Sequence, residues 1–196
     1  MTNLKKLALL TALLGASNIA LADNSDPYQG WFLGGGLNTS KFDVSNDTGF
    51  STSGSYAVGF EILGGYSFTF YDKFVGQAEA KLRISHSKSG IDGVDLFKEK
   101  YSTSLAYLQG YKVTEQFVPY VKLGIDVAQI DSDASIDRYI DGDTTSHFIY
   151  GIGAKYALNS HSVIGVEYTF ADAPHQRTNE LVAESNTFSL TYSYHF

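Results

Sequence analysis

The sequence contains no cysteine, which excludes disulfide bonds and thiolate metal ligands. Charged residues are also scarce, because they make up 18% of the chain against the ~25% usual for soluble domains. A soluble protein with so few charges would struggle to cover its surface with polar groups. The composition therefore indicates that something other than water covers part of the surface, and that burial alone stabilises the fold.

A long apolar run is missing too. The most apolar segment, residues 7–14, is short of the ~20 residues that a membrane-spanning helix needs. Two lysines precede it and the small-residue sequence Ala20-Leu21-Ala22 follows it, a pattern typical of a secretory signal peptide. We therefore expect residues 1–22 to be a signal peptide and residues 23–196 to form one domain.

Basic residues are outnumbered in this expected domain. It holds 12 Lys and Arg residues against 21 Asp and Glu residues, a net charge of −9. Nucleic-acid binding requires an excess of basic residues that can contact phosphates, so a nucleic-acid partner is not expected.

Apolar and polar residues alternate in eight stretches after Pro27, and a period of two indicates β-strands. The stretches are residues 30–42, 56–68, 74–85, 101–111, 118–130, 147–156, 164–170 and 187–196. Their length of about ten residues matches the ~9–11 that a tilted transmembrane strand needs. Long segments (43–55, 86–100, 131–145 and 171–184) follow the odd-numbered stretches, and short ones follow the even-numbered stretches. The spacing predicts hairpins with long loops at one end and short turns at the other.

The polar face of these stretches indicates which side is enclosed. Gly, Ala and Ser are common on it, and a narrow eight-stranded interior can hold only such small residues in number. Its charges are balanced, with four of each sign: Glu61, Glu79, Lys81, Arg83, Lys122, Asp126, Lys155 and Glu167. Because buried charge is costly unless it is paired, this set predicts an enclosed network, with the apolar face turned outward to lipid.

Aromatic residues near the ends of the stretches favour the same orientation, since such rings suit membrane–water interfaces. By the short turns lie Phe70, Tyr71, Phe74, Phe117, Tyr120, Tyr156 and Phe196, and by the long segments lie Tyr56, Tyr101, Phe148, Phe170 and Phe188. Lipid offers backbone groups no hydrogen-bond partners, so a sheet that crosses it must close. We expect an all-β fold, an eight-stranded antiparallel up-and-down transmembrane β-barrel with short periplasmic turns and long extracellular loops.

The last stretch, "TFSLTYSYHF", ends on an aromatic residue instead of a polar tail. Its apolar positions are Phe188, Leu190, Tyr192, Tyr194 and Phe196. Together with the signal peptide, the eight stretches and the opening "YQGWFLGGGLNTS", this ending resembles the OmpA/OmpX-like small outer-membrane β-barrels over residues 28–196. One departure is that the chain ends with the barrel, so a peptidoglycan-binding domain and a cell-wall role are not expected.

The resemblance implies a place in the bacterial outer membrane, in contact with lipid and lipopolysaccharide, and a monomer. It also implies that the apolar residues of the last stretch form an assembly signal for the barrel assembly machinery, and that interior salt bridges plug the barrel. Glu61 and Lys81 are expected at similar heights on adjacent strands, with Glu79 and Arg83 beside them. These charges could form a gate or a narrow ion pathway, but structural filling is favoured because eight strands leave little interior space.

One long segment, residues 131–145, is rich in aspartate. It holds Asp131, Asp133, Asp137, Asp141 and Asp143 against a single Arg138. Carboxylate clusters can bind Ca²⁺, and Asp-x-Asp is a fragment of the EF-hand pattern. The glycine and the later glutamate of that pattern are missing, so a solvated acidic loop is favoured and no metal or other cofactor is expected.

The histidines invite a comparison with barrels that acylate or deacylate lipid A. His86 with Ser87 and Ser89, His147 and His175 are all expected near the outer rim. A nucleophile needs a base within hydrogen-bond reach and a third group that orients the base, and the sequence shows no such arrangement. We therefore do not expect an enzyme.

Two patterns near the N-terminus suggest other folds. "GWFLGGG" is not a phosphate-binding loop, because no helix follows it, and its glycines are expected to allow close packing in the barrel. Its Gly-Trp pair is similar to the lipocalin Gly-x-Trp, but the spacing is wrong, and a lipocalin would turn the apolar face inward.

With no catalytic site evident, function is expected in the loops that a rigid scaffold presents. The favoured hypothesis is a structural or surface-interaction protein that acts in adhesion, colonisation or resistance through host or surface ligands. A small channel for ions or hydrophobic molecules is the alternative, and a lipid A-modifying enzyme is the third.

Overall fold

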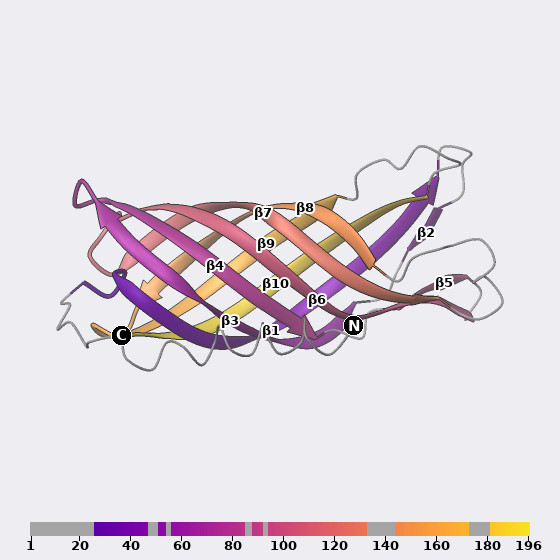
Figure 1. Ribbon diagram of the computed structural model, residues 1–196, viewed down its shortest axis with the longest axis horizontal. Helices are drawn as coiled ribbons and strands as arrows, with labels where there is room; N and C mark the ends of the chain where they lie inside the picture. The colour runs from indigo at the N-terminus through magenta and orange to yellow at the C-terminus, as the bar shows by residue number, and fades with distance from the viewer. Residues whose placement is uncertain are drawn as a thin grey trace, which may run out of the picture.

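The computed structural model describes residues 26–46, 51–53, 56–84, 88–91, 94–132, 144–172 and 181–196. The strands are β1 (Gly30–Asn46), β2 (Ser51–Ser53), β3 (Ala57–Phe70), β4 (Phe74–Ile84), β5 (Lys88–Ile91), β6 (Val94–Tyr111), β7 (Phe117–Ser132), β8 (Thr144–Ala157), β9 (Ser162–Asp172) and β10 (Leu181–His195) (Figure 1). No helix in this part of the chain is long and apolar enough to cross a membrane.

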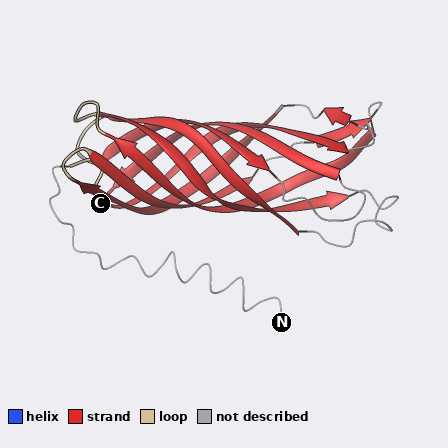
Figure 2. Ribbon diagram, turned by 90° about the horizontal axis from the view of Figure 1, so that it is seen from above, coloured by secondary structure: helices blue, strands red, loops and turns tan. Residues whose placement is uncertain are grey.

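Eight of these strands form a closed antiparallel barrel in the order β1-β3-β4-β6-β7-β8-β9-β10. Figure 2 shows the closed wall. The last strand closes on the first over a continuous register from Phe32↔His195 to Asn46↔Leu181. The two short strands, β2 and β5, pair with the far ends of β1 and β6. Closure leaves the barrel wall without an open edge, as a hydrocarbon environment requires. The predicted eight-stranded antiparallel barrel is therefore confirmed.

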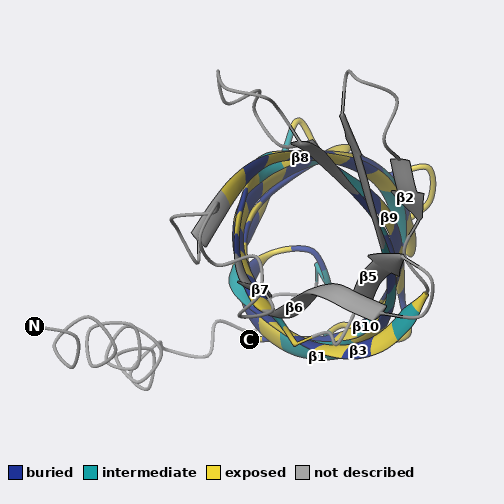
Figure 3. Ribbon diagram, turned by 90° about the vertical axis from the view of Figure 1, so that its right-hand side faces the viewer, coloured by how far each residue is buried: buried dark blue, intermediate teal, exposed yellow. Residues whose placement is uncertain are grey.

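Buried and exposed residues alternate along the strands of the wall (Figure 3), and the large exposed side chains are apolar or aromatic. On β3, Phe60 is 67% exposed while its neighbour Glu61 is 3% exposed. Aromatic contacts lie near the periplasmic edge, where the ring centroids of Trp31 and Tyr66 are 5.3 Å apart and those of Phe74 and Tyr111 are 5.4 Å apart. An apolar exterior around an ionic interior is the orientation of a membrane barrel and the reverse of a soluble one.

Seven of the eight barrel strands are longer than predicted, and β4 ends one residue earlier than predicted. The barrel strands run from 11 residues in β4 to 18 in β6, and β6 starts at Val94 and not at Tyr101. Parts of the predicted loops are therefore strand, and β10 likewise begins at Leu181, within a predicted loop. Apolar alternation marks only the segment that faces lipid, whereas the hydrogen-bonded ladder continues into the polar residues beyond it.

Two glycines of "GWFLGGG" lie directly against the backbone of β10. A Cβ atom on Gly34 would lie 2.3 Å from the carbonyl oxygen of Tyr192, and one on Gly36 would lie 2.4 Å from that of Leu190. Any side chain at either position would collide with the backbone of the closing strand. The close-packing interpretation of this segment agrees with these distances.

Candidate functional site in the barrel interior

Five of the eight predicted interior charges meet at one level of the barrel. They come from four strands: Glu61 from β3, Glu79 and Lys81 from β4, Lys122 from β7, and Glu167 from β9. All five are buried. Because β6, β7 and β8 separate β4 from β9 in the wall, the group joins opposite sides of the interior.

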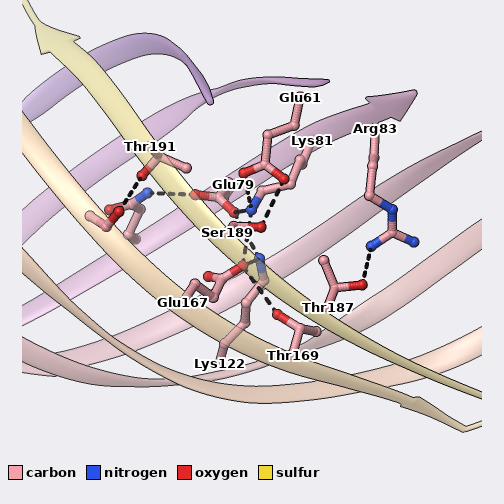
Figure 4. Close-up of polar contacts among 12 residues, drawn as sticks. Glu61, Glu79, Lys81, Arg83, Lys122, Glu167, Thr169, Thr187, Ser189 and Thr191 are labelled. Atoms are coloured by element: carbon pink, nitrogen blue, oxygen red, sulfur yellow. Dashed lines mark hydrogen bonds and ion pairs between the residues drawn. The ribbon is translucent and has the colours of Figure 1, made fainter. Parts of the chain in front are cut away.

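The two lysines of this group bridge its three carboxylates (Figure 4). Lys81 Nζ lies 3.1 Å from Glu61 Oε1, 2.9 Å from Glu167 Oε1 and 3.9 Å from Glu79 Oε1. Lys122 Nζ lies 2.9 Å from Glu79 Oε1 and 2.9 Å from Glu167 Oε1. Each ammonium group therefore contacts more than one carboxylate, so removal of either lysine would affect every acid around it.

Neutral side chains supply further hydrogen bonds to these carboxylates. Ser189 Oγ donates to Glu61 Oε2 at 2.9 Å, and Tyr120 OH donates to Glu167 Oε2 at 2.9 Å. Gln77 Nε2 donates to Glu79 Oε2 at 3.2 Å. Buried charges are tolerated only when such partners replace water, and these donors meet part of that need.

The three remaining predicted charges lie above and below this group. Arg83 and Asp126 form a second pair on the extracellular side, with Nη2 3.6 Å from Oδ2, and Arg83 Nη1 also donates to Thr187 Oγ1 at 3.2 Å. On the periplasmic side, Lys155 donates to Gln77 Oε1, and its Nζ lies 5.4 Å from the ring centroid of Phe32. Gln77 therefore connects Lys155 to the central group.

Tyr120 was predicted in the interfacial aromatic group, and that prediction is wrong. The side chain is 7% exposed and points into the barrel, where it bonds to Glu167. The signal was present in the sequence, because Lys122 was predicted inside the barrel and residues two positions apart in a strand share a face. Gln77 lies two positions before Glu79 and so shares its predicted inner face, but nothing in the sequence indicates that it links two charges.

An apolar layer closes the barrel below the charges. Tyr28, Val75, Val118, Ala157 and Val163 form a buried cluster near the periplasmic end. The Tyr28 hydroxyl donates to the Gln116 carbonyl, so the segment before β1 crosses the mouth of the barrel. Between Glu61 and the Arg83–Asp126 pair, the remaining cavity has a volume of only about 10 Å³, near the smallest that can hold one water. In the described residues, the interior is therefore filled by side chains at these levels.

Asp26 holds the same segment in place. Its Oδ2 accepts hydrogen bonds from Lys112 Nζ at 2.6 Å and from Thr69 Oγ1 at 2.7 Å, and its Oδ1 accepts one from the Tyr28 amide at 3.0 Å. Partial burial raises the pKa of Asp26, but these hydrogen bonds and the Lys112 charge outweigh it, so the pKa lies below its ordinary value of 3.8. The ionised form is therefore the one that the fold stabilises.

We predict that Asp26→Asn is less stable than the wild type near neutral pH and that this difference shrinks in acid. A pKa lowered by folding contributes stability that is present above the ordinary pKa and is lost as the pH falls through the lowered value. Urea unfolding midpoints measured near neutral pH and below about pH 4 test this, because the difference between variant and wild type isolates Asp26 from other carboxylates. Asp72→Asn, in an exposed turn, is the control; a pH-independent difference at Asp26 would contradict the prediction.

The remaining candidate residues are placed as follows. His147 is the fourth residue of β8, and it is buried inside the barrel opposite Asp126. His86, Ser87, His175, Asp133, Asp137, Arg138, Asp141 and Asp143 lie outside the described residues, and only the backbone of Ser89 and Asp131 is described. Among the side chains that are described, no three His, Asp or Glu residues form a group that could hold a metal ion.

The residues predicted as an assembly signal line the outer face of β10. Phe188, Leu190, Tyr192, Tyr194 and Phe196 are all exposed on that face. The amide of Phe196 donates to the Trp31 carbonyl at 2.8 Å, which ties the end of the chain to β1. Their role in assembly stays a prediction.

The closed wall, the apolar exterior and the paired charges within define an integral membrane β-barrel. The chain matches the family described as outer membrane protein beta-barrel domain over residues 7–196, and it belongs to that family. The resemblance to small outer-membrane barrels is therefore confirmed, and the protein is located in the bacterial outer membrane.

Solved structures show the same fold at low sequence identity. Neisserial surface protein A (NspA) has a TM-score of 0.58 at 15% identity, with 85% of this chain and 97% of that one covered. OprG from Pseudomonas aeruginosa has a TM-score of 0.57 at 16% identity, with 88% of this chain and 99% of that one covered. Ail, the attachment invasion locus protein of Yersinia pestis, has a TM-score of 0.51 at 16% identity, with 86% of this chain and 99% of that one covered. A search of curated proteins gave no match.

Proposed function

We propose that the protein is a surface-interaction protein, which binds its partner through extracellular loops carried by a plugged barrel. The observation that carries this proposal is the filled interior. The ion network around Lys81 and Lys122 spans the barrel, and the apolar cluster around Tyr28 closes the periplasmic end. A barrel of this kind offers solutes no open path and serves instead as a rigid support.

The extended strands support a role outside the membrane. The β1–β10 ladder continues to Asn46↔Leu181, well beyond Phe188, and the β6–β7 ladder continues to Phe97↔Ser132. Strands that project past the apolar belt hold loop ends in a defined arrangement, and loops on a rigid scaffold are common sites of binding.

The charge of the loop segments indicates the kind of partner. Residues 43–55, 86–100, 131–145 and 171–184 together hold thirteen acidic and five basic residues, a net charge of −8. The interior charges cancel, so nearly all of the acidic excess belongs to these segments. A basic partner surface fits this excess, and its binding would weaken as salt screens the attraction.

The names of structural neighbours agree with this role without establishing it. Ail is named as an attachment invasion locus protein and NspA as a surface protein. At 15–16% identity these likenesses concern the fold, so the proposal depends on the plugged interior and the loop charges of this chain.

The test is to replace the five aspartates of residues 131–145 with asparagine and to compare adherence to epithelial cells and matrix proteins. We expect the substituted strain to lose most of the adherence that the wild-type protein confers, while the amount of folded barrel is unchanged. A matched control replaces Asp72 and Glu115 in the periplasmic turns, on the other side of the membrane. Single-channel steps in planar bilayers, or a change in the mass of lipid A when the protein is expressed, would instead favour a channel or an enzyme.

A further inference from the structure

The outer wall of the barrel carries a shallow trough with a volume of about 660 Å³. Its floor is formed by Pro119 of β7 and Ala154 of β8, which lie opposite each other in the register. Phe74 and Tyr111 border one end, and Tyr168 and Phe188 border the other. Small residues between two pairs of aromatic rings make a hollow in the wall.

The trough presents apolar surface to the membrane. Apart from the hydroxyl groups of Tyr111 and Tyr168, Gln109 is the one polar side chain on its outward-facing border. Gln109 is satisfied within the protein, because Oε1 accepts from Tyr107 OH at 2.8 Å and Nε2 donates to the Gly110 carbonyl at 3.2 Å. Glu167 also borders the trough, but its carboxylate is bound inside the barrel by Lys81 and Lys122. Because neither Gln109 nor Glu167 turns a charge or an unmet hydrogen-bonding group outward, hydrocarbon is the occupant that fits.

The height of the trough assigns it to one leaflet. It begins at the periplasmic edge, where Phe74 is the first residue of β4 and Tyr111 the last of β6. It ends at Tyr168, six positions into β9, and Phe188, seven positions before the end of β10. At ~3.3 Å per residue and a tilt of ~40°, this is a rise of roughly 15–18 Å, close to the ~15 Å of half a hydrocarbon core.

We propose that the trough binds one acyl chain of a glycerophospholipid from the periplasmic leaflet, seated over Pro119 and Ala154. Three observations agree: the hollow lies on the wall that already contacts lipid, its surface is apolar, and it rises from the periplasmic edge to mid-membrane. Lipopolysaccharide chains enter from the opposite leaflet and would reach only the upper end. The proposal concerns lipid binding alone and does not depend on the function of the loops.

Photolabelling in lipid nanodiscs tests this. The probe is a phosphatidylethanolamine with a diazirine at mid-chain, and labelled peptides are mapped by mass spectrometry. We expect the label to concentrate on peptides that contain Pro119 and Ala154, in preference to those containing Ala78 and Ala80, which are small and outward-facing on β4. Ala154→Trp, which fills the trough, should lower labelling there about tenfold, equivalent to roughly 1.4 kcal/mol of binding free energy.

Ala80→Trp is the matched control, because it adds the same ring to the wall away from the trough, and it should leave the trough labelling unchanged. Folding of each variant is checked by the difference in gel mobility between heated and unheated samples. If Ala154→Trp does not fold by this measure, Ala154→Leu replaces it. Even labelling around the whole wall, equal labelling in the Ala154 variant and the wild type, or stronger labelling of the trough by a diazirine on lipid A would overturn the proposal.

Discussion

Replacing Lys81 with methionine is expected to lower the free energy of unfolding by about 3–5 kcal/mol, the typical cost of removing one partner from a buried ion pair. Lys81 contacts Glu61 and Glu167 within 3.1 Å, so its loss leaves buried carboxylates with less counter-charge. Methionine has a similar length, which keeps cavity formation small. The measurement is urea unfolding in lipid vesicles, followed by the fluorescence of Trp31, the one tryptophan in the sequence.

The control for this variant is Lys73→Met, in the exposed turn between β3 and β4, where a surface charge contributes little to stability. We also expect the Lys81 variant to conduct no better than the wild type in planar bilayers, because Lys122 and the Tyr28 cluster remain. Equal stability of the two lysine variants, or large open channels in the unmodified protein, would refute the structural role of the network.

Replacing Leu123 with lysine is expected to cost about 2–4 kcal/mol in a bilayer, the range found for a charge on the lipid face at mid-membrane. Leu123 lies in the middle of the membrane-facing part of β7 and is 65% exposed. In a soluble barrel, an exposed leucine could become lysine without loss. The effect therefore tests which solvent surrounds the wall, and the same unfolding assay measures it.

Leu158→Lys is the control, because this leucine is 53% exposed but lies in the turn before β9. Near the interface, the expected cost is only about 0–1 kcal/mol. If both variants were equally stable, or if the Leu123 variant stayed dissolved and monodisperse without detergent, the assignment of the outer face to lipid would be wrong.

The alternation of residues along each strand predicted which charges lie inside the barrel, but not which of those charges contact each other. The alternation placed Glu61 and Lys81 on one face of adjacent strands, and the register makes them diagonal neighbours, since Glu61 lies opposite Arg83 and Leu63 opposite Lys81. The bonds from Lys81 and Lys122 to Glu167 could not be predicted in the same way. They cross the barrel, so they depend on its diameter and on the stagger of strands that are far apart in sequence.

The errors have related causes. Tyr120 was predicted to lie at the membrane interface because aromatic residues near strand ends were expected there. The alternation along β7 already placed it on the inner face. Most strands were predicted too short, because apolar alternation ends where a strand leaves the lipid, whereas its hydrogen-bonded ladder continues.

The barrel, its orientation and its membrane location follow from the amino-acid sequence alone, because a two-residue period with few charges leaves a chain only one way to satisfy its backbone and its apolar face together. The pairing of the charges, the closure of the periplasmic mouth by the segment around Tyr28, and the position of the hollow in the wall depend on the assembled barrel. Those features arise only when strands distant in sequence are set at a particular stagger around a common axis, and that stagger is a property of the closed sheet as a whole.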